Sequence, residues 1–295
     1  FGTEHTELMA APTTADLIPA LATQFDEPMV DSSMIPTLLV SKLVRQYCKV
    51  ALGGDGGDEL FGGYPYYSRL LWLRHRLGHV PASLRSVVSL LAARWLPVGM
   101  KGRSFLQGLS TDLRAGLPMQ INGVFDSLTR RTLMRHHSNY GAFAESMHRA
   151  LTPAVQDVLH RATRMVFNIF LADDLLVKVD RTSMLNSLEI RAPMLDYRLI
   201  EFAFAKVPSR LKATERQKKI LLKRLVDRVL PSGFDRDRKQ GFSIPLSNWL
   251  RKGPFRELFW DTLTSGDCLF DRSAVNKLFK LQDRGLDNGE RLFAL

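Results

Sequence analysis

The feature that most constrains the fold is the stretch KVALGGDGGDELFGGY, residues 49–64. Its short apolar run, KVALG, predicts a buried strand. The strand is followed at once by glycines at positions 53, 54, 56 and 57 and by Asp55, Asp58 and Glu59. Glycine allows positive φ angles and a close approach of the backbone to a ligand, with N–H groups free to bind an anion. The stretch therefore predicts an anion-binding turn at the carboxyl end of a strand.

The residues around this stretch predict an α/β fold. We expect a short strand at residues 4–10, a helix at 14–25 and a second helix at 32–47, which has Ser32 or Ser33 as its N-cap and Pro36 in its first turn. A strand, helices and a further strand in this order are typical of a crossover unit in a parallel sheet. The chain after residue 60 has mostly helical periodicity, including a turn near Pro193 and Asp196 and a helix at 215–230.

Composition narrows the range of partners. The chain has 41 basic and 30 acidic residues, which gives a net charge of +11. The basic residues are dispersed at helical spacing, so we interpret most of them as solvated helix faces and expect neither nucleic acid nor membrane as a partner. The basic charge keeps nucleic acid as an alternative partner. It is a minor alternative, because the sequence contains no RNA-binding or zinc-finger signature. Two cysteines without metal-ligand spacing favour a reducing cytoplasm.

The acidic residues of the glycine-rich stretch suggest metal binding. Asp55 and Asp58 are three residues apart, a spacing at which carboxylate oxygens can converge on Mg²⁺ beside phosphate oxygens. The alternative is an acidic turn in which Asp58 only caps the next helix. Neither the dinucleotide-binding nor the Walker A pattern is present, so the loop by itself does not identify a ligand.

Four segments in the same order carry a family resemblance. They are DEPMVDSSMIP, VALGGDGGDELFGGY, KVDRTSMLNSLEIRAPMLD and DRKQGFSIPLSNWL. Together they resemble the synthetase domain of glutamine-dependent asparagine synthetases. The resemblance implies a partial parallel sheet of the ATP-pyrophosphatase (adenine nucleotide alpha hydrolase-like) type with a predominantly helical C-terminal part. It also implies that ATP adenylates the side-chain carboxylate of aspartate and that glutamine-derived ammonia displaces AMP to give asparagine.

The resemblance assigns roles to particular residues. It places Gly53 and Gly54 against the nucleotide, Asp55 at the position linked to forming and consuming the adenylate, and Asp58 on Mg²⁺. Lys239 matches the lysine that stabilises phosphate charge in the transition state. Asp31 and Ser32, at a helix N-terminus, are candidates for binding a substrate carboxylate or ammonium, although a capping role is an equal alternative.

Departures from the family pattern leave alternatives open. Many relatives have Ser at position 53 and Glu at position 55, so the acceptor could be another carboxylate, as in a sugar-polymer-linked amidotransferase or a β-lactam-forming synthetase. The phosphate loop S-G-G-x-D-S and the glutaminase domain do not occur in residues 1–295. We therefore expect one synthetase domain that is incomplete at its N-terminus, inactive alone and able to form a homodimer. A non-catalytic basic binding protein is the alternative from another class.

Overall fold

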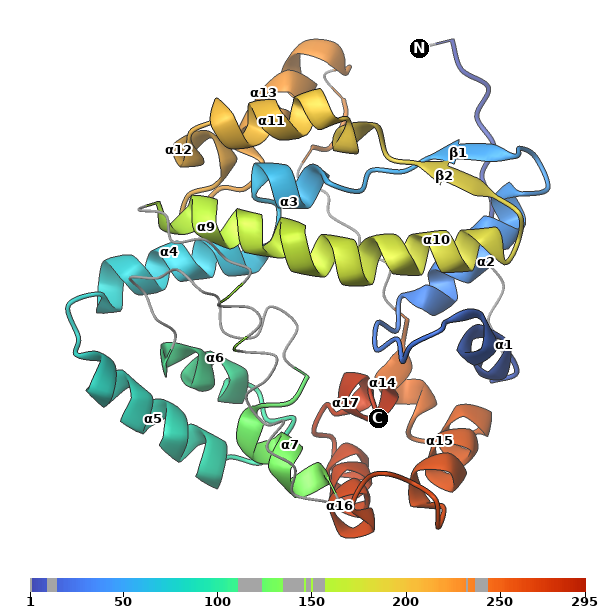
Figure 1. The fold of residues 1–295 in the computed structure, drawn as a ribbon, viewed down its shortest axis with the longest axis vertical. Coiled ribbons are helices and arrows are strands. Elements are labelled where there is room, and N and C mark those ends of the chain that lie inside the picture. Colours follow the sequence, from blue (N-terminus) through green and yellow to red (C-terminus); the bar gives the residue numbers. More distant parts are fainter. Residues whose placement is uncertain are drawn as a thin grey trace.

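The structure is a computed structural model of a mostly helical α/β chain (Figure 1). It describes residues 2–9, 15–110, 124–134, 146, 150, 157–231, 233–236 and 244–295. The elements in chain order are α1 (Leu17–Gln24), α2 (Met34–Val44), β1 (Val50–Leu52), α3 (Gly57–Phe61), α4 (Pro65–Leu77), α5 (Ala82–Trp95), α6 (Arg103–Gln107), η1 (Gly108–Ser110), α7 (Ser127–Leu133), α9 (Val158–Met165), η3 (Val166–Leu175), α10 (Leu176–Met184), β2 (Glu189–Arg191), η4 (Pro193–Leu195), α11 (Tyr197–Ala205), α12 (Ser209–Lys212), α13 (Ile220–Val229), α14 (Leu246–Trp249), α15 (Pro254–Thr264), α16 (Arg272–Asp283) and α17 (Gly289–Phe293).

The sheet is small and parallel. Strands β1 and β2 pair with Val50 opposite Glu189 and Leu52 opposite Arg191. The predictions of a strand within KVALG and of a parallel sheet are confirmed. The prediction that this strand is buried is wrong, because the described sheet has only two strands and leaves Val50 42% and Leu52 74% exposed. The predicted strand at residues 4–10 is wrong for its described part, because residues 4–9 have no regular secondary structure. Strand β1 pairs instead with a segment far along the chain, which periodicity cannot reveal.

One long helical rod crosses the middle of the molecule and organises the other elements (Figure 1). It consists of α9, the π-helix η3 and α10, which follow one another without a break. Its first part contacts α3 and α4, and its last part contacts α2 and β2. The two strands and the helix α3 that follows β1 therefore lie against the same rod.

Three hydrophobic clusters stabilise this arrangement. The largest joins α1, α2 and α7 to the C-terminal helices α14–α17. A second lies between α4 and α9, where Tyr67 and Val166 are fully buried. The third packs α3 against α11, with Leu60 and Phe61 at its centre. The rod contributes side chains to the second and third clusters, so the apolar cores of the glycine-rich region depend on it.

Local sequence signals explain several helix ends. Pro36 lies in the first turn of α2, and Asp196 caps α11 by accepting a hydrogen bond from the Arg198 N–H at 2.9 Å, after the turn at Pro193. These predictions are confirmed. The helix predicted at 215–230 begins later, at Ile220, because residues 213 and 218 form a β-bridge instead. None of the helices in the described part of the chain has both the length and the hydropathy to cross a bilayer.

The exposed apolar side chain of Leu52 in strand β1 leads to a prediction about aggregation. Its residue Leu52 is 74% exposed, and exposed apolar strands promote association between chains. We expect Leu52→Lys to reduce aggregation of the 295-residue chain, because a charged side chain on a strand edge opposes pairing with another strand. Light scattering during incubation at a fixed concentration would measure the effect.

Leu269 is the matched control for this test. It is 73% exposed but lies outside the sheet, so Leu269→Lys should change aggregation much less. Equal protection by both substitutions would show that net charge, rather than the strand, governs association.

Candidate active site

The glycine-rich segment forms a tight turn between β1 and α3. The Gly53 N–H donates to the Arg191 carbonyl at 2.8 Å and so continues the pairing of the two strands past Leu52. Gly56, with φ of 92°, precedes the first residue of α3, and the Gly57 N–H donates back to the Gly54 carbonyl at 3.3 Å. The turn thus lies at the carboxyl ends of two parallel strands, where ligands of such sheets bind.

The space around the glycines differs from one position to the next. A Cβ atom at Gly56 would lie 2.3 Å from Leu195 Cδ2, and its left-handed φ also excludes most side chains. A Cβ atom at Gly53 would lie 2.8 Å from Asp55 Oδ2. At Gly54 no heavy atom lies within 4 Å of the corresponding position. The turn is therefore closed on the side of Gly56 and open at Gly54, where a ligand can approach the backbone.

Asp58 forms an ion pair that the sequence does not reveal. Its Oδ1 lies 2.5 Å from Nζ of Lys219, and both side chains are half-buried. The helix α3 begins after Gly56, so Asp58 lies inside its first turn rather than at the N-cap. The structure thus favours a charge-pairing role over the capping alternative. Gly63 lies directly beside the pair, since a Cβ atom there would lie 2.5 Å from Lys219 Cε.

Lys219 reaches Asp58 from a left-handed backbone conformation. Its φ and ψ are 52° and 38°, and it occupies the N-cap position of α13. Non-glycine residues adopt this region rarely, and each costs on the order of 1 kcal/mol. Helical periodicity places Lys219 on a solvated face of a helix from 215 to 230. That interpretation is wrong because the helix begins at Ile220, and no Gly or Asn in residues 213–219 indicates a left-handed turn.

A buried carboxyl group and tyrosines lie behind the turn. Glu59 is 2% exposed, and its carboxylate accepts a hydrogen bond from the Tyr64 hydroxyl. Burial raises the pKa of Glu59 above its usual range, and the charges of Asp58 and Asp55 raise it further, against the hydrogen bond from Tyr64. Tyr67 is fully buried and its ring lies 4.5 Å from that of Tyr66. These residues brace the turn from the core side.

Asp31 belongs to a second cluster. Lys178 of α10 donates to Asp31 Oδ2 at 2.7 Å and to Ser33 Oγ at 2.8 Å, and the Lys178 side chain is buried. The Ser33 N–H donates to Asp31 Oδ1 at 2.9 Å, at the start of α2. Burial tends to raise the pKa of Asp31, but the charge and hydrogen bonds of Lys178 and Ser33 outweigh it and lower the pKa. Asp31 is therefore ionised and fixed in position.

Asp174 adds a second carboxyl group to this cluster. It lies in the π-helix η3, and its Oδ1 is buried without a hydrogen-bond partner. Burial and the negative charge of Asp31 raise the pKa of Asp174 to about 6, although Lys178 opposes the shift. A π-helical turn carrying an unsatisfied buried carboxyl group is a common sign of a functional position.

Ser32 contacts the C-terminal helices. Its hydroxyl donates to Glu290 Oε1 of α17 at 3.0 Å. Desolvation raises the pKa of Glu290, the Ser32 hydrogen bond lowers it, and the charges of Asp31 and Asp287 raise it. The predicted substrate residues Asp31 and Ser32 thus share one acidic cluster with Asp174, Lys178 and Glu290, whereas Gly53, Gly54, Asp55 and Asp58 share the turn after β1.

Two further predictions from the sequence concern the lysine at position 239 and a Mg²⁺ ion at Asp58. Lys239 lies outside the described residues, so its position relative to the turn stays a prediction. Within the described part of the chain, no group of three or more His, Cys, Asp or Glu side chains is arranged to hold a metal ion. A Mg²⁺ ion at Asp58 would therefore need most of its ligands from phosphate and water.

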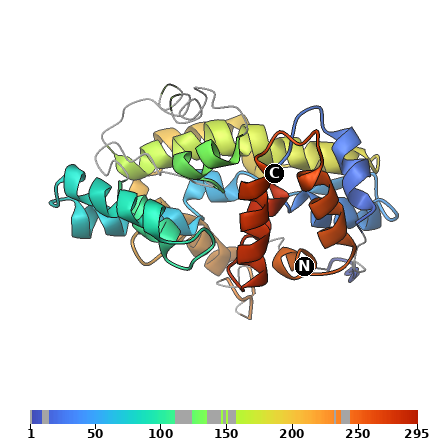
Figure 2. The ribbon, with the colours of Figure 1, turned by 90° about the horizontal axis from the view of Figure 1, so that it is seen from below.

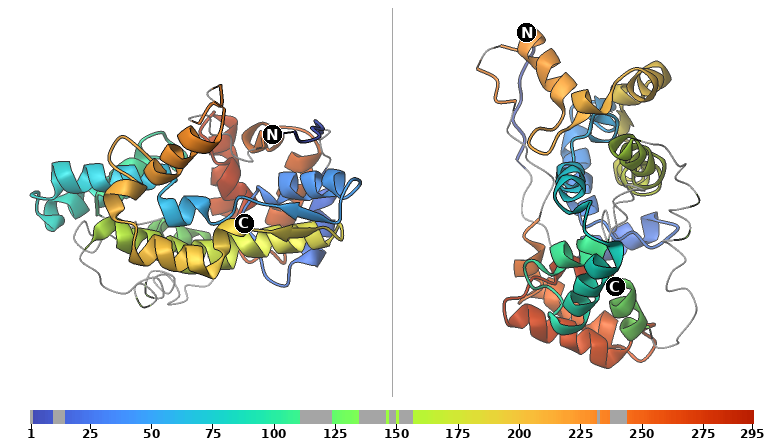
Figure 3. Two further views of the ribbon diagram at one scale, coloured as in Figure 1. Left: turned by 90° about the horizontal axis from the view of Figure 1, so that it is seen from above. Right: turned by 90° about the vertical axis from the view of Figure 1, so that its left-hand side faces the viewer.

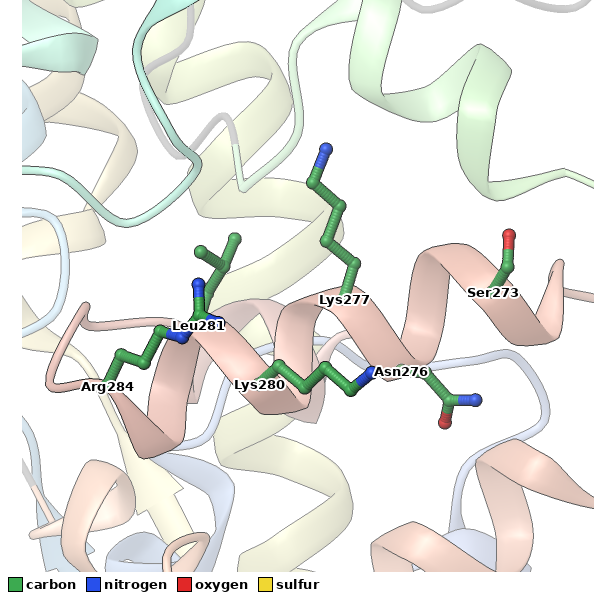
Figure 4. Close-up of a pocket in the computed structure, with 6 residues that line it drawn as sticks. All are labelled: Ser273, Asn276, Lys277, Lys280, Leu281 and Arg284. Atoms are coloured by element: carbon green, nitrogen blue, oxygen red, sulfur yellow. The ribbon is translucent and has the colours of Figure 1, made fainter.

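Two cavities lie away from the turn. One, of about 350 Å³, is lined by five residues of α16 and by Arg284 just after it, and Figure 4 shows the Lys277 and Asn276 side chains pointing to opposite sides of that helix. The other, of about 590 Å³, lies between α4, the start of α9 and the loop after α12. Neither contains a predicted site residue, and the groups in Figure 4 do not converge on one point.

The parallel strand pair and the glycine-rich turn at its carboxyl end define an α/β protein in which the expected ligand-binding edge of the sheet carries an acidic residue paired with lysine. The asparagine synthase family profile matches residues 1–295. The chain belongs to this family.

Individual relatives agree. The chain is similar to "Asparagine synthetase [glutamine-hydrolyzing] 1" of Bacillus subtilis, with 29% identity over 235 residues, which cover 79% of this chain and 37% of the relative. A Mycobacterium tuberculosis protein, named provisionally as an enzyme of the same kind, is 31% identical over 288 residues, covering 94% of this chain and 43% of the relative. The chain thus spans about two fifths of the length of these relatives.

The left-handed conformation of Lys219 gives a test of the turn. We expect Lys219→Gly to be more stable than Lys219→Ala by about 1 kcal/mol, because glycine adopts this φ without strain while both variants lose the pair with Asp58. Urea denaturation would measure the difference. At Lys223, inside α13, the order should reverse, since glycine there costs about 1 kcal/mol relative to alanine. The same order at both positions would contradict the left-handed assignment.

The raised pKa of Asp174 predicts how the free energy of unfolding depends on pH. Its pKa of about 6 lies above the usual value, so the folded state binds the proton more tightly than the unfolded chain, and stability falls as pH rises from about 4 to 6. Asp174→Asn should remove this loss and raise the free energy of unfolding at pH 8 by roughly 1–3 kcal/mol, with little gain at pH 4. Denaturation curves across this pH range would show it. The exposed neighbour Asp173 is the control, and an equal gain from Asp173→Asn would refute the explanation.

Proposed function

We propose that this chain is the synthetase part of an ATP-dependent amide-forming ligase that makes asparagine from aspartate, with ammonia derived from glutamine. The observation that carries the proposal is the turn after β1, which is open at Gly54 and leads into α3, where Asp58 pairs with Lys219. Family membership and the names of the relatives support the same reaction class.

The proposed reaction has two displacement steps. A side-chain carboxylate oxygen of aspartate attacks the α-phosphorus of ATP, and pyrophosphate leaves with the electron pair of the broken P–O bond. Ammonia then attacks the acyl carbon of the aspartyl-AMP, loses a proton, and AMP leaves. Such transfers are accelerated chiefly by positioning the reactants and by cations placed where negative charge develops.

The turn after β1 fits the nucleotide. Gly53 and Gly54 present backbone without a side chain at the carboxyl end of the sheet, and the open space at Gly54 leaves room for a phosphate or ribose group. The Asp55 carboxylate lies beside Gly53, since its Oδ2 is the atom nearest to a Cβ built there. The Cβ atom of a serine at position 53 would lie too close to that carboxylate, so the Asp55 side chain would have to shift.

Asp58 is the residue that would hold Mg²⁺. Mg²⁺ binds through one or two carboxylates together with phosphate oxygens and water, and the half-buried Asp58 carboxylate is the candidate protein ligand, in competition with the Lys219 ammonium group. When bound, the ion would neutralise phosphate charge. Lys219 orients the Asp58 carboxylate through the ion pair, and its ammonium group is a second candidate to contact phosphate. Lys239 is proposed as the further cation for the transition state.

The Asp31 cluster is proposed as the acceptor site. Lys178 offers an ammonium group for a substrate carboxylate, and Asp174 offers a carboxyl oxygen without a partner for a substrate ammonium. Both groups are needed to recognise an α-amino acid. An acceptor with another carboxylate, as in the related amidotransferases, would not need the Asp174 contact, so substitution of Asp174 would affect it less.

Pyrophosphate release by the full-length enzyme tests the proposal. With aspartate, ATP and ammonia, Lys239→Ala should lower the rate by at least about a hundredfold with a much smaller change in ATP affinity, because a cation that acts on transition-state charge affects kcat. Asp58→Asn should instead weaken magnesium-dependent nucleotide binding, since it removes a charged ligand.

Arg236 is the control cation in the loop that precedes Lys239. It pairs with Asp227, so Arg236→Ala should leave pyrophosphate release nearly unchanged. Full activity of Lys239→Ala would refute its assignment as the catalytic lysine. Absence of aspartate-dependent pyrophosphate release from the unsubstituted enzyme would favour another acceptor or the non-catalytic alternative.

A further inference from the structure

Helix α5 has its polar side turned inward. The residues of α5 that are buried are Arg85, Ser89 and Ala92, which recur at intervals of four and three and so share one face. Two of them make hydrogen bonds that fix this orientation. Arg85 Nη1 donates to the Leu109 carbonyl at 2.7 Å, and Ser89 Oγ donates to the Gln107 carbonyl at 2.9 Å.

The segment after α5 holds it in the same orientation. Arg103 of α6 donates to the carbonyls of Leu96 at 3.1 Å and Ala93 at 3.2 Å, and it pairs with Asp126 at 2.8 Å. Buried charged groups with several partners are costly to move. Helix α5 is therefore locked with its polar face against α6 and η1.

An apolar stripe consequently faces outward. At 100° per residue the exposed side chains of the stripe fall within an arc of about 100°, along a helix that is about 21 Å long. Trp95, at its C-terminal end, is 76% exposed. The stripe consists of Leu84, Val87, Val88, Leu91 and Trp95. In a globular protein such a stripe normally faces the hydrophobic core. Its exposure on α5 indicates that this face of the helix contacts an apolar partner outside the chain.

Along the chain, the charge on either side of the stripe has one sign, although Glu215 contacts His75 of α4 and Asp126 contacts Arg103 of α6. Between Glu59 and Asp112 the sequence contains no acidic residue. Exposed cations flank α5 on both sides along the chain, in α4 before it and in the segment from its last turn onward. They are Arg69, Arg74, Arg76, Arg94 and Lys101. An apolar stripe with a terminal tryptophan and flanking cations matches a helix that lies in the interface of an anionic bilayer.

We propose that the stripe of α5 binds the surface of an anionic membrane, with the helix lying parallel to the bilayer. The 14 residues of α5 are too few to span it. This inference differs from our expectation, based on the dispersed charge, that membrane is not a partner. It is independent of the proposed ligase function.

A second copy of the chain fits the stripe less well. Two α5 helices packed antiparallel would bring Arg94 and Lys101 of one chain toward Arg74 and Arg76 of the other, without acidic residues from this segment to offset the repulsion. Anionic lipid headgroups supply the opposite charge at every cation. The position of the helix agrees with a surface role, because α4 and α5 form one end of the molecule (Figure 2; Figure 3, left).

Vesicle binding by the full chain tests the proposal. We expect co-sedimentation with phosphatidylcholine vesicles that contain phosphatidylglycerol, and little with phosphatidylcholine alone. Leu91→Gln should weaken the partition coefficient by about tenfold, because it places an amide in the apolar stripe. High salt should weaken binding further, since screening reduces attraction to the anionic surface.

Leu225 provides the matched control. Leu91 and Leu225 are both 52% exposed on helices, but Leu225 lies on α13, so Leu225→Gln should leave vesicle binding unchanged. Circular dichroism and thermal melting would confirm that both variants are folded. The proposal is overturned if the unsubstituted chain does not bind anionic vesicles, or if both substitutions weaken binding equally. A concentration-dependent dimer that Leu91→Gln alone dissociates would overturn it in favour of a second copy.

Discussion

The packing of the glycine-rich turn and of the Asp31 cluster against one helical rod is the constraint on which the rest of the structure depends. The rod runs without a break from α9 through the π-helix η3 to α10, and it contacts α3 with one part and α2 and β2 with another. A π-helix rotates the residues that follow it relative to a regular helix. The π-helical part thereby lets one rod present an apolar face to α3 and α4 and the charged side chain of Lys178 to α2.

Two lysine–carboxylate pairs then set the electrostatics of the candidate site. Lys219 pairs with Asp58 beside the turn, and Lys178 pairs with Asp31 at the start of α2. Removing charges from water is costly, so a half-buried pair is weak evidence for stability. Its better-supported effect is to fix the orientation of a carboxylate. Beside the second pair, burial and the negative charge of Asp31 raise the pKa of Asp174, and the charge of Lys178 only partly opposes this shift.

The sequence predicted the turn but not its surroundings. Glycine and aspartate spacing after an apolar run is a local signal, and the strand, the turn and the α/β class followed from it. Pairing of β1 with residues 189–191, the π-helix η3 and the left-handed Lys219 depend on contacts between distant segments, which periodicity does not contain. The same reason explains the error at residues 4–10. The family motifs predict a role for Lys239, which lies outside the described residues, whereas the contact between Lys219 and Asp58 is visible only in the structure.

Helix α5 shows the limit of amphipathic patterns most clearly. Its sequence has an apolar stripe, and a stripe of this kind is normally assigned to the core. The hydrogen bonds of Arg85 and Ser89 to the carbonyls of Leu109 and Gln107 reverse that assignment, because they hold the polar face of the helix against the segment that follows it. The helix α4, about 20 Å long, separates α5 from the turn after β1. A surface bound at α5 would therefore hold the chain by one end and leave the glycine-rich turn accessible to a nucleotide.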